Sequence, residues 1–429
     1  MCLWDGGMKR LIIATDSYPY AGGEKPFLLS ELKRLSREYE IVVLSHASQS
    51  IPEQEKDRDL PQGIRVVRFP RPVIGVKEKA EALIRYVFDR DCRCEVREIC
   101  RGKKLRKERI YQSLSFFAQT LSDQKMLHES RLFQTECPVV YYSFWYTYYC
   151  NSAVREARGN ANVKVVTRAH GYDLYAERIP GNRQPFKHQM ERNLSKILFV
   201  CESTKAYYIK NIKGNGIQEE QLLVNRLGVE KAEGYPEKKQ GKEWELLSCS
   251  NVIPLKRIER IIEGLSRVDR YAIHWVHIGA GEQFEWVRQY AQKMLGEKAN
   301  IRVEFKGSLD NTEVKKYYGM HSIDAFITTS STEGCPVSIQ EAMSYQIPII
   351  ATNVGGIPEM VQGNGILLSE NPSAEEVAEA IERLAGLSED KRQELRRNSY
   401  ALWKRDYDAM TNSEELSKII GSLFSDKAV

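Results

Sequence analysis

The sequence has no apolar run long enough to span a bilayer. The longest runs, such as residues 139–145, fall far short of the roughly 20 residues that a transmembrane helix needs. Charges at Asp5, Lys9 and Arg10 interrupt the first residues, so we expect no secretory signal there. These absences predict a cytoplasmic protein, one that could still lie against the inner face of the cell membrane.

Metal and dinucleotide motifs are missing too. The 9 cysteines are scattered, mostly in apolar surroundings, as in a reducing compartment. The one cluster, Cys92, Cys94 and Cys100, has no fourth ligand at a zinc-site spacing. Gly279-Ala280-Gly281 follows a predicted strand, but Phe284 stands where a dinucleotide fingerprint has its third glycine. We therefore expect no metal and no cofactor.

Strong charge of one sign is also lacking. A formal charge of +5 on 429 residues permits anionic ligands or a lipid surface, but it does not indicate nucleic acid as a partner. Hydrophobic residues at 42% and aromatic residues at 10% are typical of a globular protein. The length is sufficient for two domains, each with its own core.

Apolar strands alternate with amphipathic helices through both halves of the chain. Residues 10–15 and 41–44 are predicted strands on either side of a helix at 28–35, the pattern of a parallel sheet with a right-handed crossover. The alternation returns after residue 245 and ends in a helical tail at 391–424. The polar stretch 230–242 is the predicted linker. The fold class is therefore α/β, with two doubly wound domains.

Residues 76–131 predict a charged helical region that is basic in its middle. The basic residues there are Arg97, Arg101, Lys103, Lys104, Arg106, Lys107 and Arg109. Such a surface could rest on anionic headgroups or hold an acidic acceptor, and a solvated helix face is the alternative. The aromatic stretch 146–149 could line a sugar site, although a place in the core is the favoured interpretation.

Residues 330–343 contain the largest group of candidate functional residues. They follow a predicted buried strand at 325–327 and enter an amphipathic helix. Glu333 lies in the loop and Glu341 one to two turns inside the helix, with the helix N-terminus between them. That N-terminus attracts anions because its first N–H groups lack partners and the helix dipole is positive there. Two carboxylates around an anion site suit a ligand with hydroxyls flanking a phosphate, such as a nucleotide sugar.

Three further groups follow predicted strands, where open α/β sheets bind ligands. Gly22-Gly23-Glu24 either lets the backbone approach a ligand or forms a flexible turn. His170 precedes a glycine just past a strand. Lys256 and Arg257, at a helix start, would supply positive charge to a diphosphate.

Together these motifs resemble retaining family 4 glycosyltransferases, the glycosyl transferases group 1, in order and spacing. The matching segments are Glu333 to Glu341 with Gly334, residues 250–257, 277–281, 305–307 and 355–359, and more thinly 22–24, 168–171 and 225–229. The resemblance implies the GT-B fold, in which two Rossmann-like domains face a central cleft. Residues 1–235 would bind the acceptor, residues 236–400 would bind the nucleotide-sugar donor, and a helix within 401–429 would return to the first domain.

The resemblance also implies residue roles. Lys256 would neutralise the leaving diphosphate, as a metal does elsewhere, and His170 would face the reacting sugar. Glu333 would contact the transferred sugar and Glu341 the ribose hydroxyls. Other implied donor contacts are Gly22, Gly23, Ser250, Asn251, Arg257, Gly279, Gly281, Gly307, Gly334, Cys335, Pro336 and Val337, while Glu24 and Asp173 would contact the acceptor.

Two positions depart from the family pattern. The family often has arginine where Asn251 stands and usually glycine where Arg257 stands, so Arg257 is expected to replace the missing charge. Pro336 has no N–H, so Cys335 and Val337 are expected to supply the backbone donors.

The implied function is metal-independent, retaining transfer of a sugar from a UDP- or GDP-sugar to a hydroxyl of a glycan, lipid-linked or small-molecule acceptor. The expected setting is bacterial surface polysaccharide or glycoconjugate synthesis. The family has no agreed protein nucleophile, so front-face displacement is expected, with the leaving phosphate oxygen helping to deprotonate the acceptor. The alternatives are a non-catalytic nucleotide-sugar-binding partner subunit and a phosphorylase or epimerase of the same fold.

Overall fold

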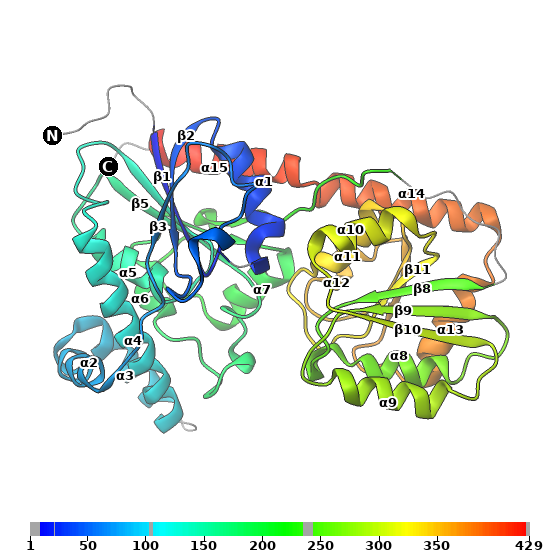
Figure 1. Ribbon diagram of the computed structural model, residues 1–429. Coiled ribbons are helices and arrows are strands. Elements are labelled where there is room, and N and C mark those ends of the chain that lie inside the picture. The colour runs from blue at the N-terminus through cyan, green and yellow to red at the C-terminus, as the bar shows by residue number, and fades with distance from the viewer. Residues whose placement is uncertain (1–8, 21, 103–105, 235–242, 426–429) are drawn as a thin grey trace. The chain divides into compact units, whose positions relative to one another are not determined.

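The computed structural model describes residues 9–20, 22–102, 106–234 and 243–425, which form two compact units (Figure 1). One unit contains residues 1–226 and 413–429, and the other residues 227–412. The chain thus enters the second unit before the predicted boundary at 235 and leaves it after the predicted one at 400. Residues 235–242 of the predicted linker, and Lys103 and Lys104 of the basic segment, lie outside the described residues.

The first unit is built on a parallel sheet of seven strands in the order β3-β2-β1-β4-β5-β6-β7. The strands are β1 (Lys9–Thr15), β2 (Tyr39–Ser45), β3 (Arg65–Arg68), β4 (Val139–Ser143), β5 (Val163–Ala169), β6 (Lys196–Phe199) and β7 (Leu222–Val224). All of β4 is buried, which explains why its sequence is a nearly continuous apolar run. The order reverses between β1 and β4, as in a doubly wound sheet.

Helices cover this sheet. They are α1 (Lys25–Leu35), α2 (Val76–Phe88), α3 (Arg90–Arg101), α4 (Arg106–Glu129), α5 (Tyr148–Glu156), α6 (Lys187–Glu191), α7 (Glu202–Asn211) and most of α15 (Ala409–Ser425). The predicted helical region 76–131 is confirmed as α2, α3 and α4. The aromatic stretch lies in the core as favoured, because Tyr146 and Tyr149 are buried.

The second unit has a parallel sheet of six strands in the order β10-β9-β8-β11-β12-β13. The strands are β8 (Trp244–Cys249), β9 (Ile273–Ile278), β10 (Ile301–Gly307), β11 (Ala325–Thr328), β12 (Ile349–Thr352) and β13 (Gly365–Leu368). The helices are α8 (Ile258–Leu265), α9 (Phe284–Leu295), α10 (Asn311–Met320), α11 (Val337–Ser344), α12 (Ile357–Met360), α13 (Ala374–Ala385) and α14 (Glu389–Asp406). The predicted α/β class with two doubly wound sheets is confirmed.

The tail forms two helices rather than one. It breaks between α14 and α15 at Tyr407 and Asp408, where Val229 donates its N–H to Tyr407 O (3.0 Å) and Asp408 forms a bridge with Val229. At the break, backbone groups of the tail form hydrogen bonds with Val229 instead of with the helix. This explains why the single helix predicted for the tail is interrupted there.

The last helix belongs to the first unit from Ser413 onward. Tyr39 Oη donates to Ser417 O (3.0 Å), and the Tyr39 ring stacks on Phe424 with 5.6 Å between centroids. Leu416 and Ile420 are fully buried. The core of the first unit is thus completed by the end of the chain. Within the described ranges, no helix combines the length and apolar character needed to cross a membrane.

The buried face of α15 allows a stability test. Ile420→Ala should lower the free energy of unfolding by about 2–4 kcal/mol, because it deletes buried methyl groups and leaves a cavity. Met410→Ala on the same helix is the control, since Met410 is 71% exposed and should stay within about 0.5 kcal/mol of the parent. Urea denaturation followed by circular dichroism measures both, and equal effects would contradict the packing described.

Candidate functional site

Apart from Gly22 and Gly23, which belong to the first unit, the predicted donor residues lie together at the carboxyl edge of the second sheet. Residues 250–257 follow β8, 279–281 follow β9, Gly307 ends β10, 333–337 follow β11, and 355–359 follow β12. The strand order reverses between β8 and β11. Loops on the two sides of such a reversal diverge and leave a ligand-binding crevice in doubly wound sheets.

Backbone hydrogen bonds join these loops. Gly279 N donates to Gly307 O (2.8 Å), Ser250 N to Ile278 O (3.0 Å), and Ser331 N to Leu255 O (2.8 Å). Gly356 N donates to Gly334 O (3.0 Å). The loops after five neighbouring strands therefore support one another, although their residues are far apart in sequence.

Three glycines are required by this packing. A Cβ on Gly279, whose φ is +143°, would lie 1.9 Å from Ser250 O, and one on Gly355 (φ +54°) would lie 1.7 Å from Glu333 O. A Cβ on Gly281 would lie 2.5 Å from Val252 O. Gly279 and Gly281 thus have a structural role, and their contact with a donor stays a prediction. Gly307 (φ +70°) has open space where a Cβ would lie.

Lys256 and Glu333 form an ion pair. Lys256 ends the 3-10 turn Pro254–Lys256 after β8, and Glu333 lies in the loop after β11. Lys256 Nζ is 2.5 Å from Glu333 Oε1, and the two side chains are 23% and 12% exposed. Two residues assigned to different parts of a donor are therefore each other's partners in this structure.

The guanidinium of Arg257 binds acceptors within its own unit, which was not predicted from the sequence. Its backbone is left-handed, with φ of 47°. Its guanidinium donates to Thr329 O (2.7 Å), Ser330 O (2.9 Å) and Glu370 O (2.7 Å), and to Asn371 Oδ1 (2.7 Å). Four of its five N–H groups are thereby engaged, so the guanidinium fastens the loops after β11 and β13, and its contact with a diphosphate stays a prediction.

Glu341 lies in the second turn of α11 and is only 7% exposed. Burial raises its pKa to about 7, against the opposing effects of a hydrogen bond from Asn311 Nδ2 (3.1 Å) and the charge of Lys315. Asn311 was not predicted from the sequence. The sequence pattern that could have located it is the capping box of Asp310 and Glu313. This pattern starts α10 directly after the loop that follows β10, and Asn311 is the first residue of that helix.

The start of α11 matches the prediction. Pro336 is its N-cap residue and Val337 its first helical residue, so Glu333 precedes the helix and Glu341 lies within it. The first backbone N–H groups of such a helix have no intrahelical acceptor. Cys335 accepts a hydrogen bond from Gln340 Nε2 (3.2 Å), which holds the approach to the helix. Asn251 is exposed and Ser250 half-buried beside it.

His170 lies in the first unit, just past β5. Its ring packs on Trp145, with 4.2 Å between centroids, and it is 8% exposed. Both ring nitrogens are buried without a hydrogen-bond partner among the described residues. Asp173 Oδ2 is 3.5 Å from Nδ1. The structure thus orients the ring by stacking on Trp145 and by the proximity of Nδ1 to Asp173.

Glu24 and Asp173 are corrections to the predicted acceptor contacts. Glu24 is buried and accepts from Trp145 Nε1 (2.6 Å) and from the backbone N–H groups of residues 16–18 (2.8–2.9 Å). Asp173 is buried and accepts from the N–H groups of Tyr146 (2.7 Å) and His170 (2.6 Å). Both carboxylates therefore hold loops in place and are not presented to a ligand.

The glycines before Glu24 remain compatible with close approach of a ligand. Gly22 and Gly23 open the 3-10 turn Gly22–Glu24, and Gly23 is exposed, with nothing within 4 Å of the place where a Cβ would lie. The flexible-turn interpretation is not supported by the bonds of Glu24, which tie this turn to the loop after β1.

A pocket that the sequence did not predict lies in the first unit. It encloses about 220 Å³ between α4, α6 and the end of α7, and Arg109, Arg183, Lys187 and His188 contribute to its lining. These groups already have partners: Arg109 donates to Gly181 O (2.7 Å), and Arg183 and His188 pair with Glu98. Burial lowers the pKa of Lys187 to about 8.

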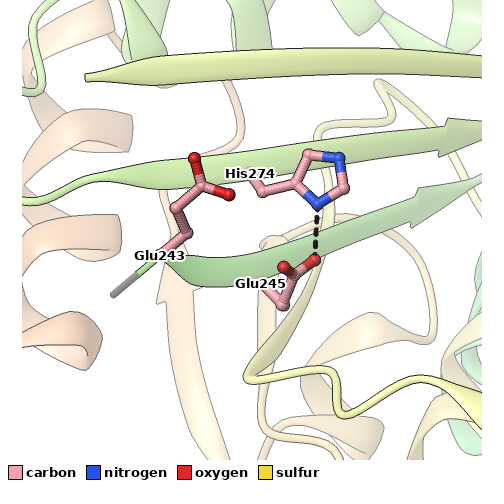
Figure 2. A group of neighbouring side chains, drawn as sticks. All are labelled: Glu243, Glu245 and His274. Atoms are coloured by element: carbon pink, nitrogen blue, oxygen red, sulfur yellow. Dashed lines mark hydrogen bonds and ion pairs between the residues drawn. The ribbon is translucent and has the colours of Figure 1, made fainter. Parts of the chain in front are cut away.

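Glu243, Glu245 and His274 are the one group in the described part of the chain that could hold a metal ion (Figure 2). His274 Nδ1 is 2.7 Å from Glu245, while Arg302 already pairs with Glu243 at 2.6 Å. The group lies where β8 and β9 begin, at the opposite edge of the sheet from Lys256 and Glu333. It is therefore not part of the candidate site.

Comparison with known families finds a match over the part of the chain that contains this sheet edge. Residues 232–402 match the family model "Glycosyl transferases group 1". The second unit is a glycosyl transferases group 1 domain. An O-antigen biosynthesis glycosyltransferase of Escherichia coli, WbnH, is 30% identical over 169 residues, which are 39% of this chain and 45% of that protein. The chain thus spans less than half the length of this curated relative.

Solved structures show that the fold extends beyond the group 1 domain. The lipopolysaccharide outer core galactosyltransferase WaaB has a TM-score of 0.68 at 16% identity, covering 97% of this chain and 99% of that one. Anabaena HepE in complex with UDP and glucose has a TM-score of 0.65 at 16% identity, covering 97% and 100%. The chain has the GT-B fold, as the sequence predicted.

Glu341 in the group 1 domain generates a pH-dependent prediction. Its pKa is about 7 in the folded chain, above the ordinary value of 4.5, so the folded state binds more protons than the unfolded state between these values. The contribution of Glu341 to the free energy of unfolding therefore falls as pH rises from about 4.5 to about 7. Glu341→Gln should raise the free energy of unfolding at pH 8 by up to about 3 kcal/mol and leave it unchanged at pH 4.

Urea titrations of both proteins at several pH values measure this difference. Glu282→Gln serves as the control because Glu282 is exposed. If the curves of the parent and of Glu341→Gln stayed parallel across the whole range, the buried ionisable state assigned to Glu341 would be wrong.

Proposed function

We propose that the chain is a retaining glycosyltransferase that takes a sugar from a nucleoside-diphosphate sugar. The observation that carries this proposal is the arrangement of Lys256, Glu333, the start of α11 and Glu341 at the carboxyl edge of a group 1 domain. It provides one cation, one helix N-terminus and two carboxylates. A nucleotide sugar has a diphosphate between two sets of hydroxyls, which these groups complement.

Lys256 would bind the diphosphate. The ammonium is now 2.5 Å from Glu333, and a diphosphate with its larger negative charge would compete for it. Release of Glu333 would then leave a carboxylate able to accept hydrogen bonds from hydroxyls of the transferred sugar. Donor binding would thus create the sugar contact by exchanging one partner of Lys256 for another.

Glu341 would accept hydrogen bonds from the ribose hydroxyls. Two hydroxyl donors stabilise the ionised form of a carboxyl group, so donor binding would lower the pKa of Glu341 from about 7. Asn311, which already donates to this carboxyl, would keep it oriented. The affinity for the donor would consequently fall at low pH, when Glu341 is protonated.

The reaction would be a front-face displacement without a covalent enzyme intermediate. The pairing with Lys256 argues for Glu333 as a positioning group rather than a nucleophile. Lys256 and the N–H groups at the start of α11 would stabilise the charge that develops on the leaving phosphate, a role that makes a metal unnecessary. His170 would face the reacting sugar, the role that the resemblance implies.

The proposed donor is a UDP- or GDP-sugar, and the acceptor a hydroxyl of a glycan or a lipid-linked intermediate in bacterial surface polysaccharide synthesis. UDP is supported by the structural likeness to HepE, and the biosynthetic setting by the sequence likeness to WbnH. Peripheral membrane contact would fit a lipid-linked acceptor.

A thermal-shift panel of UDP-, GDP- and ADP-sugars tests donor binding, because a ligand that binds only the folded state raises the melting temperature. The shift should appear with one nucleotide series, and nucleoside diphosphate should be released when a glycan acceptor is added. Binding without release would favour a partner subunit, dependence on inorganic phosphate a phosphorylase, and conversion of the donor alone an epimerase.

Lys256→Ala should lower the rate of nucleoside diphosphate release by about 100- to 1,000-fold, because it removes a preorganised charge from the leaving group. Glu333→Ala should also remove most of the activity. Lys293→Ala, an exposed lysine on α9, is the control and should keep the parental rate. Circular dichroism checks that the variants are folded, and full turnover in both site variants would rule out the assignment.

A further inference from the structure

Helix α2 presents an apolar face to solvent. Leu83, Ile84, Val87 and Phe88 are 54%, 64%, 59% and 75% exposed, and Val76 is 86% exposed. Positions 76, 80, 83, 84, 87 and 88 recur at helical spacing, so they share one face. A globular protein rarely exposes neighbouring large apolar side chains without a partner for them.

The opposite face of α2 packs on the first unit. Ala82 and Tyr86 are buried, Tyr86 Oη lies 2.7 Å from Ser113 Oγ on α4, and the rings of Tyr86 and Phe117 are 5.7 Å apart. Helix α2 lies at the periphery of the first unit (Figure 1). It is fixed there by one apolar face, while the side chains of its second apolar face are exposed. The burial of α2 in its own unit does not explain the outer face.

The neighbouring helix α3 separates its charges by side. Its acidic residues face inward, where Arg155 pairs with Asp91 (3.0 Å) and Arg183 with Glu95 (2.8 Å). The basic residues are exposed, namely Arg90, Arg93, Arg97 and Arg101. Within the described part of the chain, no hydrogen bond or ion pair engages the side chains of Arg90, Arg97 and Arg101.

The arginine row adjoins the apolar face. Arg93 Nη1 donates to Phe88 O (2.6 Å). The guanidinium of Arg93 therefore lies at the end of α2, next to the exposed residue Phe88. Arg90 begins α3 two residues after Phe88. Apolar side chains bordered by unpaired cations are the pattern of a surface that enters the interface of an anionic bilayer.

We propose that the outer faces of α2 and α3 form a docking surface for an anionic lipid membrane. The apolar side chains of α2 enter the boundary between headgroups and acyl chains, and the arginines of α3 lie among the phosphate groups. The inference rests on the exposure and charge of these two helices and is independent of the proposed sugar transfer. It keeps Arg97 and Arg101 of the basic segment 97–109 that the sequence suggested, and adds the start of α3 and the apolar face of α2.

Charge complementarity favours a membrane over a second copy of the chain. A two-fold contact that covers both helices would bury two arginine rows in one interface, and burying charges without counter-ions is unfavourable. Anionic headgroups supply the counter-charge at high density. The apolar face alone would suit either occupant, and the arginines distinguish them.

Co-sedimentation of the full chain with vesicles tests the proposal. The parent should bind vesicles of 30 mol% phosphatidylglycerol in phosphatidylcholine, should bind pure phosphatidylcholine much more weakly, and should be released by high salt because exposed charges are screened. The variant Arg90→Gln/Arg97→Gln/Arg101→Gln should lose about 100-fold in affinity, at roughly fivefold for each arginine near an anionic surface. Leu83→Ser/Ile84→Ser/Phe88→Ser should lose at least about tenfold on both lipid mixtures.

Matched substitutions in the second unit provide the controls. Arg270→Gln/Arg288→Gln/Arg383→Gln removes the same charge, and Trp286→Ser/Met320→Ser/Met410→Ser removes comparable exposed apolar groups. Both controls should bind as the parent does. Equal losses in the controls, or an unaffected α2–α3 variant, would overturn the proposal.

Analytical ultracentrifugation of the same proteins tests whether a second copy of the chain binds this surface instead. A parent that is dimeric, becomes monomeric on substitution of the α2 face and ignores the vesicles would show a second copy on this surface and overturn the proposal. Because none of these measurements uses turnover, a negative result here is separate from a failure of the proposed activity. The melting temperature of each variant confirms that it is folded.

Discussion

The candidate site depends on how closely the loops at the carboxyl edge of the second sheet approach one another. Where Gly279 and Gly355 lie, the facing carbonyl oxygens leave no room for a side chain. The backbone of Glu333 is one of these neighbours, so its position follows from the loop after β12 as well as from its own. Arg257 adds the loop after β13 to the same assembly. Moving Lys256 or Glu333 would therefore disturb packed contacts between the loops of several strands at once.

Local patterns were sufficient to predict the elements. Apolar runs bounded by turns predicted the parallel strands, and the spacing of Glu333 and Glu341 correctly placed one ahead of α11 and the other within it. The predicted donor residues of the second unit lie at one sheet edge because they follow strands of a doubly wound sheet, which is a topological rule rather than a detail of packing. The roles assigned to these residues stay predictions until they are measured.

Contacts between distant residues could not be predicted in this way. The sequence shows that Glu24 and Asp173 are acidic loop residues, but not that Glu24 accepts a hydrogen bond from Trp145 and Asp173 one from the amide of Tyr146. Arg257 shows the same limit, because its acceptors are backbone carbonyls that have no sequence signature. Asn311 escaped notice since its partner, Glu341, lies 30 residues away. In each case the chemistry of the residue was clear and its neighbours were not.

The division of the first unit into two chain segments has a consequence for synthesis. Residues 1–226 leave the ribosome before residues 227–412, yet Leu416, Ile420 and Leu423, which are buried in the first unit, are made only after them. Domains usually fold in the order in which they are translated. Here the second unit can finish folding while the first still exposes the apolar surface that α15 covers. The first unit therefore waits for its native core until the whole of the second unit has been made.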